Sequence, residues 1–237
     1  MSPEFSLIDK YFNLYKTKAY KGIGDDAALI KKDTNNLWAI SIDMLNEKTH
    51  FLPNTDPFNL GWKALAVNIS DIYAMGGDPK FALLAIALPQ VKTDWMKEFS
   101  NGLFSCAKKY RVELIGGDTT KGSLSISICM LGEVPKKNVL LRSSAKKEDD
   151  IWVTGELGLA ALGLAKLQSK IQLPQGLSKK AIGALEKPML HSSIIQSMAR
   201  LSHSAIDISD GLIADLTHIL EASKLGANIT LKNIPMN

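Results

Sequence analysis

The sequence has few cysteines, no long apolar run and no marked excess of charge, and each shortage excludes a class of protein. Its two cysteines, Cys106 and Cys129, fit none of the spacings of zinc, haem or disulfide-exchange motifs. Two isolated thiols are typical of a reducing compartment, so we expect a cytoplasmic protein. No apolar run reaches the ~20 residues of a membrane span, and MSPEFSLIDKYF at the start lacks the basic and apolar segments of a signal peptide.

The net charge and the absence of a standard nucleotide-binding motif exclude further classes of function. The net charge of +4 and the 22% of charged residues are ordinary for a globular protein and give no basic excess that would indicate a nucleic-acid partner. The phosphate-binding pattern G-x-x-x-x-G-K-[ST] is absent, and GGDTTKGS (116–123) does not fit it. In VTGELGLAALG (153–163) the glycines open a helix after a strand, which fits either phosphate binding or close helix packing.

Strand-like and helix-like segments interleave along the chain, which predicts a mixed α/β fold. The expected helices cover residues 3–16, 57–75, 93–110, 156–168, 178–186, 191–201 and 210–224. One expected strand follows the turn GIGDD, and the others lie at 37–43, 80–88, 112–115, 123–134, 151–155, 205–209 and 226–234. The polar run RSSAKKEDD (142–150) is the best boundary, and we expect two domains, at 1–147 and 148–237.

The most informative pattern is where the aspartates fall. They stand at the expected strand ends, in glycine-flanked turns, or within an otherwise apolar helix: Asp25, Asp26, Asp43, Asp71, Asp118, Asp207 and Asp210. Strand ends of α/β proteins converge at one edge of a sheet, where ligands commonly bind. Carboxylates gathered there repel one another, so the cluster needs cations. Oxygen ligands without cysteine favour Mg²⁺ over zinc.

Each acid also has a structural alternative. Asp210 is equally explained as the N-cap of the helix after it. Asp215 is interpreted as an exposed helical residue partnered by His218. Asp26 and Asp118, beside glycines, fit ordinary turn chemistry. Taken together rather than singly, the acids favour a metal–phosphate site.

Six stretches together resemble one family, thiamine-monophosphate kinase, of the aminoimidazole ribonucleotide synthetase-like superfamily. They are GIGDDAAL, SIDML with EKTHF, GWKALAVNISDIYAMGGDP, LIGGDTTKG, VTGELGLAALGL and AIDISDGLIADL, in the family's order and over essentially the whole chain. The resemblance implies a two-domain PurM-like α/β (α+β) architecture. In that architecture the N-terminal mixed sheet with helices pairs with the same sheet of a second subunit in a homodimer, and we expect the C-terminal α/β domain to be truncated in this chain.

The resemblance also implies an activity, transfer of the γ-phosphoryl group of ATP to thiamine monophosphate, giving thiamine diphosphate. The acceptor is itself a phosphate that is largely ionised at neutral pH, so it needs no strong general base. The obstacle is the approach of two polyanions, so catalysis should consist largely of positioning and charge neutralisation. Direct in-line transfer assisted by several Asp-bound Mg²⁺ ions suits this requirement.

The resemblance assigns site residues motif by motif. The implied magnesium ligands are Asp26, Ser41, Asp43, Asp71, Asp118, Asp207 and Asp210. Asp210, innermost in the DISDG motif, is the implied catalytic residue. The implied ATP contacts are Gly117, Asp118, Arg142 and Ser209. Considered by itself, His50 is interpreted as a surface histidine or a hydrogen-bonded core histidine. The resemblance implies that it contacts thiamine monophosphate.

The chain departs from the family pattern at four places, one of which is the boundary run RSSAKKEDD (142–150), which lacks the glycine usually found before the aspartate. NEKTHF (46–51) stands where the family usually has V-E-G-V-H-F, and FSNG (99–102) replaces an expected aromatic residue near the nucleotide base. The chain ends at NIPMN, where the family continues through a G-G-E-D-Y-like segment of the substrate pocket. Two alternatives therefore stay open: a truncated, non-catalytic Mg-nucleotide-binding fragment, or a superfamily sibling that acts on another phosphate acceptor.

Overall fold

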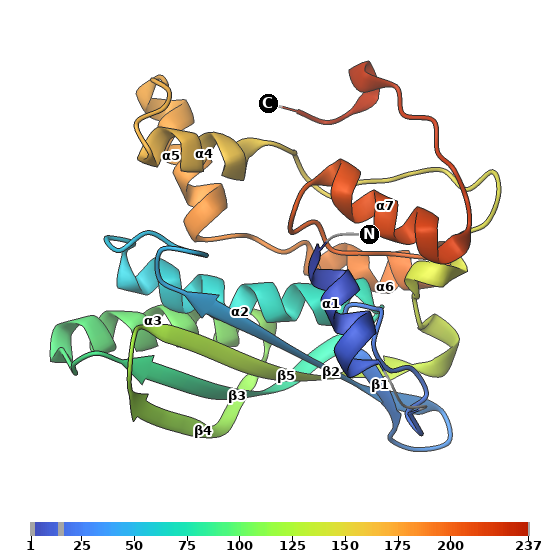
Figure 1. Cartoon of the computed structure of the whole chain (residues 1–237), viewed down its shortest axis with the longest axis horizontal. Coiled ribbons are helices and arrows are strands. Elements are labelled where there is room, and N and C mark those ends of the chain that lie inside the picture. Colours follow the sequence, from blue (N-terminus) through green and yellow to red (C-terminus); the bar gives the residue numbers. More distant parts are fainter. Residues whose placement is uncertain (1–2, 14–16, 237) are drawn as a thin grey trace.

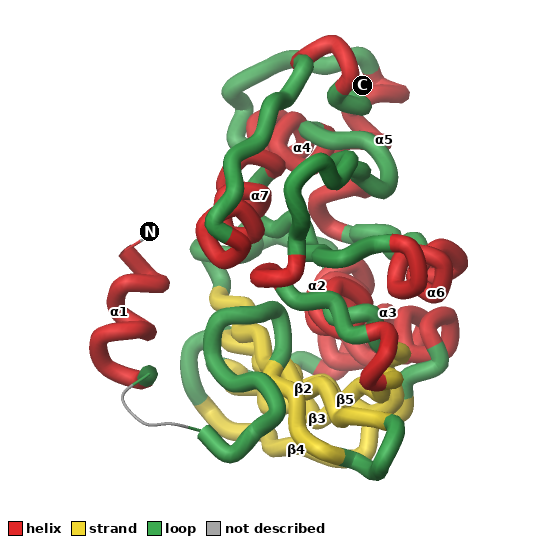
Figure 2. The backbone as a smooth tube through the Cα atoms, turned by 90° about the vertical axis from the view of Figure 1, so that its right-hand side faces the viewer, coloured by secondary structure: helices red, strands yellow, loops and turns green. Residues whose placement is uncertain are grey.

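A computed structural model describes residues 3–13 and 17–236 of the chain. Within these residues the strands of the sheet all lie before residue 136, and helices and loops make up residues 136–236. In Figure 2 the sheet forms the lower end of the molecule, α4 and α5 lie at the upper end, and α2 and α3 lie between. The mixed α/β fold class is confirmed.

The sheet has five strands in the order β1-β2-β5-β3-β4. Their bounds are β1 Ala28–Lys31, β2 Asn36–Asn46, β3 Asp78–Leu88, β4 Glu113–Lys121 and β5 Ser125–Pro135. Neighbouring strands are antiparallel except β3 and β4, which are parallel. A parallel pair requires a crossover connection, and α3 (Thr93–Tyr110) supplies it between these two strands.

Two helices, α2 (Pro57–Ala74) and α3, cover one face of the sheet (Figure 1). The strands alternate accordingly: Ile126, Ile128 and Met130 of β5 are buried, while the residues between them are partly exposed. On the opposite face Ile42 and Met44 are 69% and 56% exposed. The sheet is therefore covered on one side and open on the other.

The helix α2 begins where the sequence predicts it. Asp56 is the N-cap, its Oδ1 accepts the backbone N–H of Asn59 at 2.9 Å, and Pro57 takes the first helical position. The sequence also favours Thr93 as the N-cap of the helix that ends at Tyr110, but Thr93 is the first residue inside α3, and Lys92 before it caps the helix without a side-chain hydrogen bond. A helix start marked by an acceptor side chain and a proline is thus predicted more reliably than one marked by a threonine alone.

The remaining elements are helical. Their bounds are α1 Pro3–Phe12, η1 Lys136–Asn138, η2 Arg142–Ser144, α4 Leu159–Leu167, α5 Gln175–Glu186, α6 Ser192–Leu201, α7 Leu212–Ser223 and η3 Leu231–Asn233. The expected helix over 3–16 ends at Phe12, and its last three expected residues lie outside the described part. No helix in the described part of the chain is both long and apolar enough to cross a bilayer.

Three expected strands, at 151–155, 205–209 and 226–234, are wrong. A strand needs a neighbour that pairs with its N–H and C=O groups. In the described residues after 150, the bridge that forms is a single parallel one, between Leu157 and Met236. Apolar alternation marks a segment that can be extended, but it does not supply the partner strand.

Polar contacts join the helical second half of the chain to the helices over the sheet. The indole Nε1–H of Trp62, on α2, donates to the carbonyl of Pro188 at 2.8 Å. The backbone N–H of Leu190 donates to the hydroxyl of Tyr110, at the end of α3, at 2.9 Å. These bonds fix the segment between α5 and α6 against the first half of the chain. The predicted domain boundary near 147 stays a prediction.

Candidate functional site

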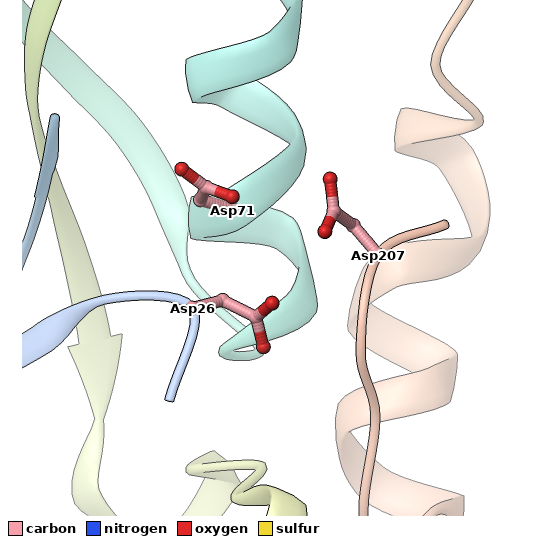
Figure 3. A group of neighbouring side chains, drawn as sticks. All are labelled: Asp26, Asp71 and Asp207. Atoms are coloured by element: carbon pink, nitrogen blue, oxygen red, sulfur yellow. The ribbon is translucent and has the colours of Figure 1, made fainter. Parts of the chain in front are cut away.

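Three aspartates from distant parts of the sequence meet in space (Figure 3). Asp26 lies in the turn before β1, Asp71 on α2, and Asp207 in the extended segment before α7. One carboxylate oxygen of each lies within 4.8 Å of the others. Figure 3 shows the three side chains projecting into the same space from separate elements. The fold thus concentrates negative charge at one point between the two halves of the chain.

The surroundings make this charge unfavourable. Burial, followed by the charges of Asp43, Asp207 and Asp26, raises the pKa of Asp71 to about 9. Burial and the neighbouring charge of Asp26 raise the pKa of Asp207 to about 7. Such shifts mean that the carboxylates resist ionising together. A bound cation would remove that resistance.

Asp26 has a cationic partner already. The Nη2 of Arg142 lies 2.7 Å from Asp26 Oδ1, and the backbone N–H of Arg142 donates to Asp25 Oδ1 at 2.7 Å. Burial raises the pKa of Asp26, and the Arg142 guanidinium opposes that rise. Lys21 pairs with Asp25 at 2.6 Å. The turn 25–26 is therefore fastened to η2, and the arginine predicted to contact ATP lies beside the acidic group.

Asp43 and Ser41, on β2, lie next to the three aspartates. Asn68 of α2 accepts the backbone N–H of Asp43 through Oδ1 at 3.1 Å and donates to the Ala64 carbonyl at 3.0 Å. Burial raises the pKa of Asp43, and the nearby Ser41 hydroxyl, which is buried without a hydrogen-bond partner among the described residues, opposes the rise in the pKa of Asp71. Asn68 thus joins strand to helix at the site, a contact that sequence reasoning did not assign.

His50 lies in a tight turn after β2. Its Nδ1 accepts the backbone N–H of Asn46 at 3.0 Å, and its own carbonyl accepts from Lys63 Nζ at 3.1 Å. The ring is close enough to Asp43 to oppose the rise that burial causes in that group's pKa. His50 therefore adjoins the acidic site from the β2 side without joining the three aspartates.

Gly117 and Asp118 are placed differently from the other predicted site residues. Both lie on β4, opposite Leu84 and Ala85 of β3, and Asp118 is exposed and outside the group formed by the three aspartates. At Gly117 the backbone φ is +149°, and a Cβ atom would lie 1.8 Å from the Leu84 carbonyl oxygen. A glycine is required here by the packing of β4 on β3, whatever else it contacts.

The segment carrying Ser209 and Asp210 is exposed and leads into α7. Gly211, not Asp210, is the residue before the helix, and no side chain caps it, so the N-cap interpretation of Asp210 is wrong. Asp215, expected on the surface, is only 3% exposed, so that interpretation is wrong as well. Its Oδ2 accepts the backbone N–H groups of residues 209–211 at 3.0, 3.1 and 3.0 Å.

A signal for the burial of Asp215 is present in the sequence. Leu212, Asp215 and Leu216 are spaced i, i+3, i+4 and share one face of α7, and both Asp215 and Leu216 are buried. An acid on the apolar face of a helix is buried with it and needs hydrogen-bond donors. The spacing therefore marked Asp215 as internal, although nothing in the sequence named its partners.

The donor set indicates what the site can hold. The converging atoms are carboxylate oxygens, without thiolate or imidazole among them. Hard divalent cations such as Mg²⁺ prefer such ligands. Asp26, Asp71 and Asp207 fit this group, because burial and neighbouring carboxylates raise the pKa of each in a way that a divalent cation would reverse.

Comparison with known proteins gives consistent matches. A family model described as AIR synthase related protein, N-terminal domain, matches residues 24–134. The thiamine-monophosphate kinase of Buchnera aphidicola subsp. Acyrthosiphon pisum (strain APS) is 47% identical over 99% of this chain and 74% of its own length. That of Escherichia coli (strain K12) is 45% identical over 99% of this chain and 73% of its own length.

Solved structures of thiamine-monophosphate kinases are also similar to this chain. AaThiL complexed with AMPPCP and TMP superposes with a TM-score of 0.84 at 30% identity, covering 93% of this chain and 69% of that one. Thiamine-monophosphate kinase from Stenotrophomonas maltophilia K279a gives a TM-score of 0.81 at 37% identity, covering 99% and 77%.

The mixed sheet and the helices on one of its faces, together with these matches, define an enzyme of the PurM-like fold class. Identity and coverage then settle the family within that class. The chain belongs to the thiamine-monophosphate kinase family.

Proposed function

We propose that this protein transfers the γ-phosphoryl group of ATP to thiamine monophosphate. Family membership supports the activity, and AaThiL, which shares the fold, has been solved with AMPPCP and TMP. The observation that carries the proposal is the meeting of Asp26, Asp71 and Asp207 within 4.8 Å. Three carboxylates at one point are costly unless cations bind there, and a reaction between two phosphate groups requires cations in such a place.

Mg²⁺ is the cation we assign to the site. Bound there, it supplies neutralisation of the charge on the reacting phosphates. The proposed ligands are Asp26, Ser41, Asp43, Asp71, Asp118, Asp207 and Asp210. All of these except Asp118 and Asp210 are supported by their mutual proximity, through carboxylate distances or through their effects on the pKa of Asp71. Asp210 is exposed on the adjoining segment, where it is accessible to substrate.

The remaining roles concern binding and orientation. Arg142, with its guanidinium fork beside Asp26, is proposed to contact ATP phosphates, as a planar donor suited to bidentate recognition. Ser209 and Gly117 are the other proposed ATP contacts. His50, adjoining Asp43, is proposed to contact thiamine monophosphate. Because the acceptor phosphate is already ionised near neutral pH, no residue is needed to deprotonate it.

A homodimer in the cytoplasm is part of the proposal. The open sheet face exposes Ile42, Met44 and Leu83 by 69%, 56% and 38%. Exposed apolar patches of this kind mark association surfaces, and a second copy of the same face would cover it symmetrically. The use of ATP and the free thiols of Cys106 and Cys129 favour the cytoplasm.

The test is product formation by variants. Asp71→Asn keeps the shape of the side chain but removes one ligand charge, and we expect kcat for thiamine diphosphate formation to fall about 100-fold or more. Asp94→Asn, an exposed acid in the first turn of α3, is the matched control and should leave kcat unchanged. Unchanged kcat in Asp71→Asn contradicts the assignment of the site.

A panel of acceptors separates the alternatives in the same assay. Transfer to thiamine monophosphate and not to other phosphate acceptors supports the proposal. Transfer to another acceptor alone identifies a superfamily sibling. Calorimetric binding of Mg-nucleotide with no product from any acceptor identifies a non-catalytic fragment.

A further inference from the structure

Asp215 organises the segment that carries two of the proposed metal ligands. Its Oδ2 accepts three consecutive backbone N–H groups, from Ser209, Asp210 and Gly211, at 3.0, 3.1 and 3.0 Å. The residue is only 3% exposed. Gly211, with φ at +119°, makes the turn that brings the three N–H groups to one point. The carboxylate is thus enclosed by the backbone of residues 209–211.

Three converging N–H groups ahead of a helix form a cradle of the kind that binds phosphate or other anions. Here a carboxylate of the same chain fills it. Hydrogen bonds to a charged acceptor are about twice as strong as neutral ones, and α7, which spans 12 residues, adds the favourable field of its N-terminus. Asp215 therefore holds the segment in one conformation.

That conformation matters because of the residues that the segment carries. Asp207 lies two residues before the cradle and is one of the three converging aspartates, while Asp210 lies within it. Since the amide N–H of Asp210 is bonded to Asp215, the Cα of Asp210 is fixed and its side chain leaves the cradle from a defined point. The N–H groups themselves are occupied, so they are not offered to a phosphate.

We propose that Asp215 is a positioning residue of the metal site, which folds segment 207–211 so that Asp207 and Asp210 present their carboxylates to divalent cations. The inference rests on the proposed function, because it takes those two aspartates as metal ligands. It adds that phosphate contacts of this segment run through side chains and cations, not through its backbone N–H groups.

Two substitutions of Asp215 separate charge from hydrogen bonding. Asp215→Asn keeps an acceptor oxygen of similar shape without the charge, and Asp215→Ala removes both. Leu216→Ala is the matched control, since Leu216 is the buried neighbour on α7, 8% exposed, and supplies none of the three hydrogen bonds of the cradle.

The first readout is hydrogen exchange of the amides of residues 209–211 in the full chain. We expect exchange about 10-fold faster or more in Asp215→Ala, an intermediate rate in Asp215→Asn, and no local change in Leu216→Ala beyond its effect on global unfolding. Exchange at these three amides that stays at the wild-type rate in Asp215→Ala overturns the inference.

The second readout is the binding of Mn²⁺, used as a probe of the divalent site and measured by titration without substrate. We expect the Kd to rise about 10- to 100-fold in Asp215→Ala, the range found when groups that orient metal ligands are lost. Excess Mg²⁺ should restore kcat in Asp215→Asn, so the defect lies in the KM for Mg²⁺. Equal weakening of Mn²⁺ binding in Leu216→Ala and Asp215→Ala, at equal loss of thermal stability, reduces Asp215 to a structural residue and overturns the inference.

The two proposals fail in different ways. Wild-type protein that binds no Mn²⁺ contradicts the proposed function, and the metal role of Asp215 with it. Wild-type protein that binds Mn²⁺, with unchanged affinity in both Asp215 variants, contradicts the positioning role alone.

Discussion

At the residue scale the main feature is a group of buried aspartates whose ionised form is unfavourable. Burial and neighbouring carboxylates raise the pKa values of Asp71 and Asp207 to about 9 and about 7, while the nearby Arg142 is paired with Asp26. Natural proteins keep such groups where a ligand compensates them. The sequence was sufficient to select these aspartates, because acids within apolar stretches are conspicuous. It could not show which of them converge.

Asp118 and Asp215 mark the limits of that selection. Asp118 follows two glycines and was expected in a loop after a strand, yet it lies exposed on β4, because the strand continues through the glycines to Lys121. Asp215 looked like a surface acid and is buried. For Asp118 the outcome depends on tertiary packing, because local sequence does not show that β4 continues past the glycines. For Asp215 the spacing with Leu212 and Leu216 indicated the buried face of α7, but not the backbone N–H groups that the carboxylate accepts.

The raised pKa values predict how metal-free protein responds to pH. Asp71 has a folded pKa of about 9 against an ordinary value of 3.8. In the folded protein Asp71 therefore binds its proton more tightly than in the unfolded chain. The stability that this proton contributes is fully present below pH 3.8 and is lost as the pH rises through about 9. We expect the Tm of metal-free protein to fall between pH 5 and pH 9 by several degrees, about 2–4 °C per kcal/mol for a chain of this size.

Protons and cations compete for the same carboxylates, so the effect of Mg²⁺ should run the opposite way. The rise in Tm on adding Mg²⁺ should grow with pH, with apparent affinity changing by about tenfold per pH unit for each proton displaced. Thermal scans with and without Mg²⁺ measure this directly. In Asp71→Asn the pH dependence should flatten. A Mg²⁺ effect that is independent of pH contradicts the raised pKa values.

At the element scale α2 is the element on which the site depends. It carries Asp71 toward the acidic group, Asn68 toward Asp43 and Trp62 toward Pro188, from different positions along one helix. Its start, its length and its apolar character could all be predicted, because Asp56-Pro57 at its start and Gly76-Gly77 after its end are strong local signals. The strands expected in the second half of the chain could not be predicted reliably from local sequence, because a strand requires a pairing partner that local sequence does not specify.

The crossing of α2 and α3 predicts the effect of one substitution. A Cβ at Gly102 would lie 1.8 Å from the Phe58 backbone oxygen, so Gly102→Ala forces the two helices apart. We expect a loss of about 1–3 kcal/mol in the free energy of unfolding, as for other overpacked sites, measured by urea denaturation. Asn101→Ala, the exposed neighbour on α3, is the control and should change stability by less than about 0.5 kcal/mol. Equal stability of the two variants contradicts the close crossing.

At the scale of the whole molecule the sheet has one covered and one open face, and the chain spans 74% of the length of its Buchnera relative. The open face carries Ile42, Met44 and Leu83, where a solvent-facing sheet would have polar residues. The pattern was visible in β2, where apolar residues occupy both alternating positions of the strand. Its meaning for assembly becomes clear only once α2 and α3 are seen to cover the other side.

The proposed homodimer gives a prediction at this scale. Met44→Asp places a charge on the open face and should convert dimer to monomer, with a rise in the dimer Kd of about 100-fold or more. Phe104→Asp is the matched control, because Phe104 is 52% exposed on α3, in the helical layer on the opposite side. Sedimentation velocity measures both. Wild-type protein that is monomeric at all concentrations contradicts the dimer.

The central claim is that the aspartates of this chain bind divalent cations for transfer of a phosphoryl group to thiamine monophosphate. Incubation of the full chain with ATP labelled at the γ-phosphorus, thiamine monophosphate and Mg²⁺ tests it most directly. We predict label in thiamine diphosphate, an equal amount of ADP, and no transfer when the divalent cation is removed with a chelator. Label released only as inorganic phosphate, or transfer that persists in the chelator, would contradict the claim.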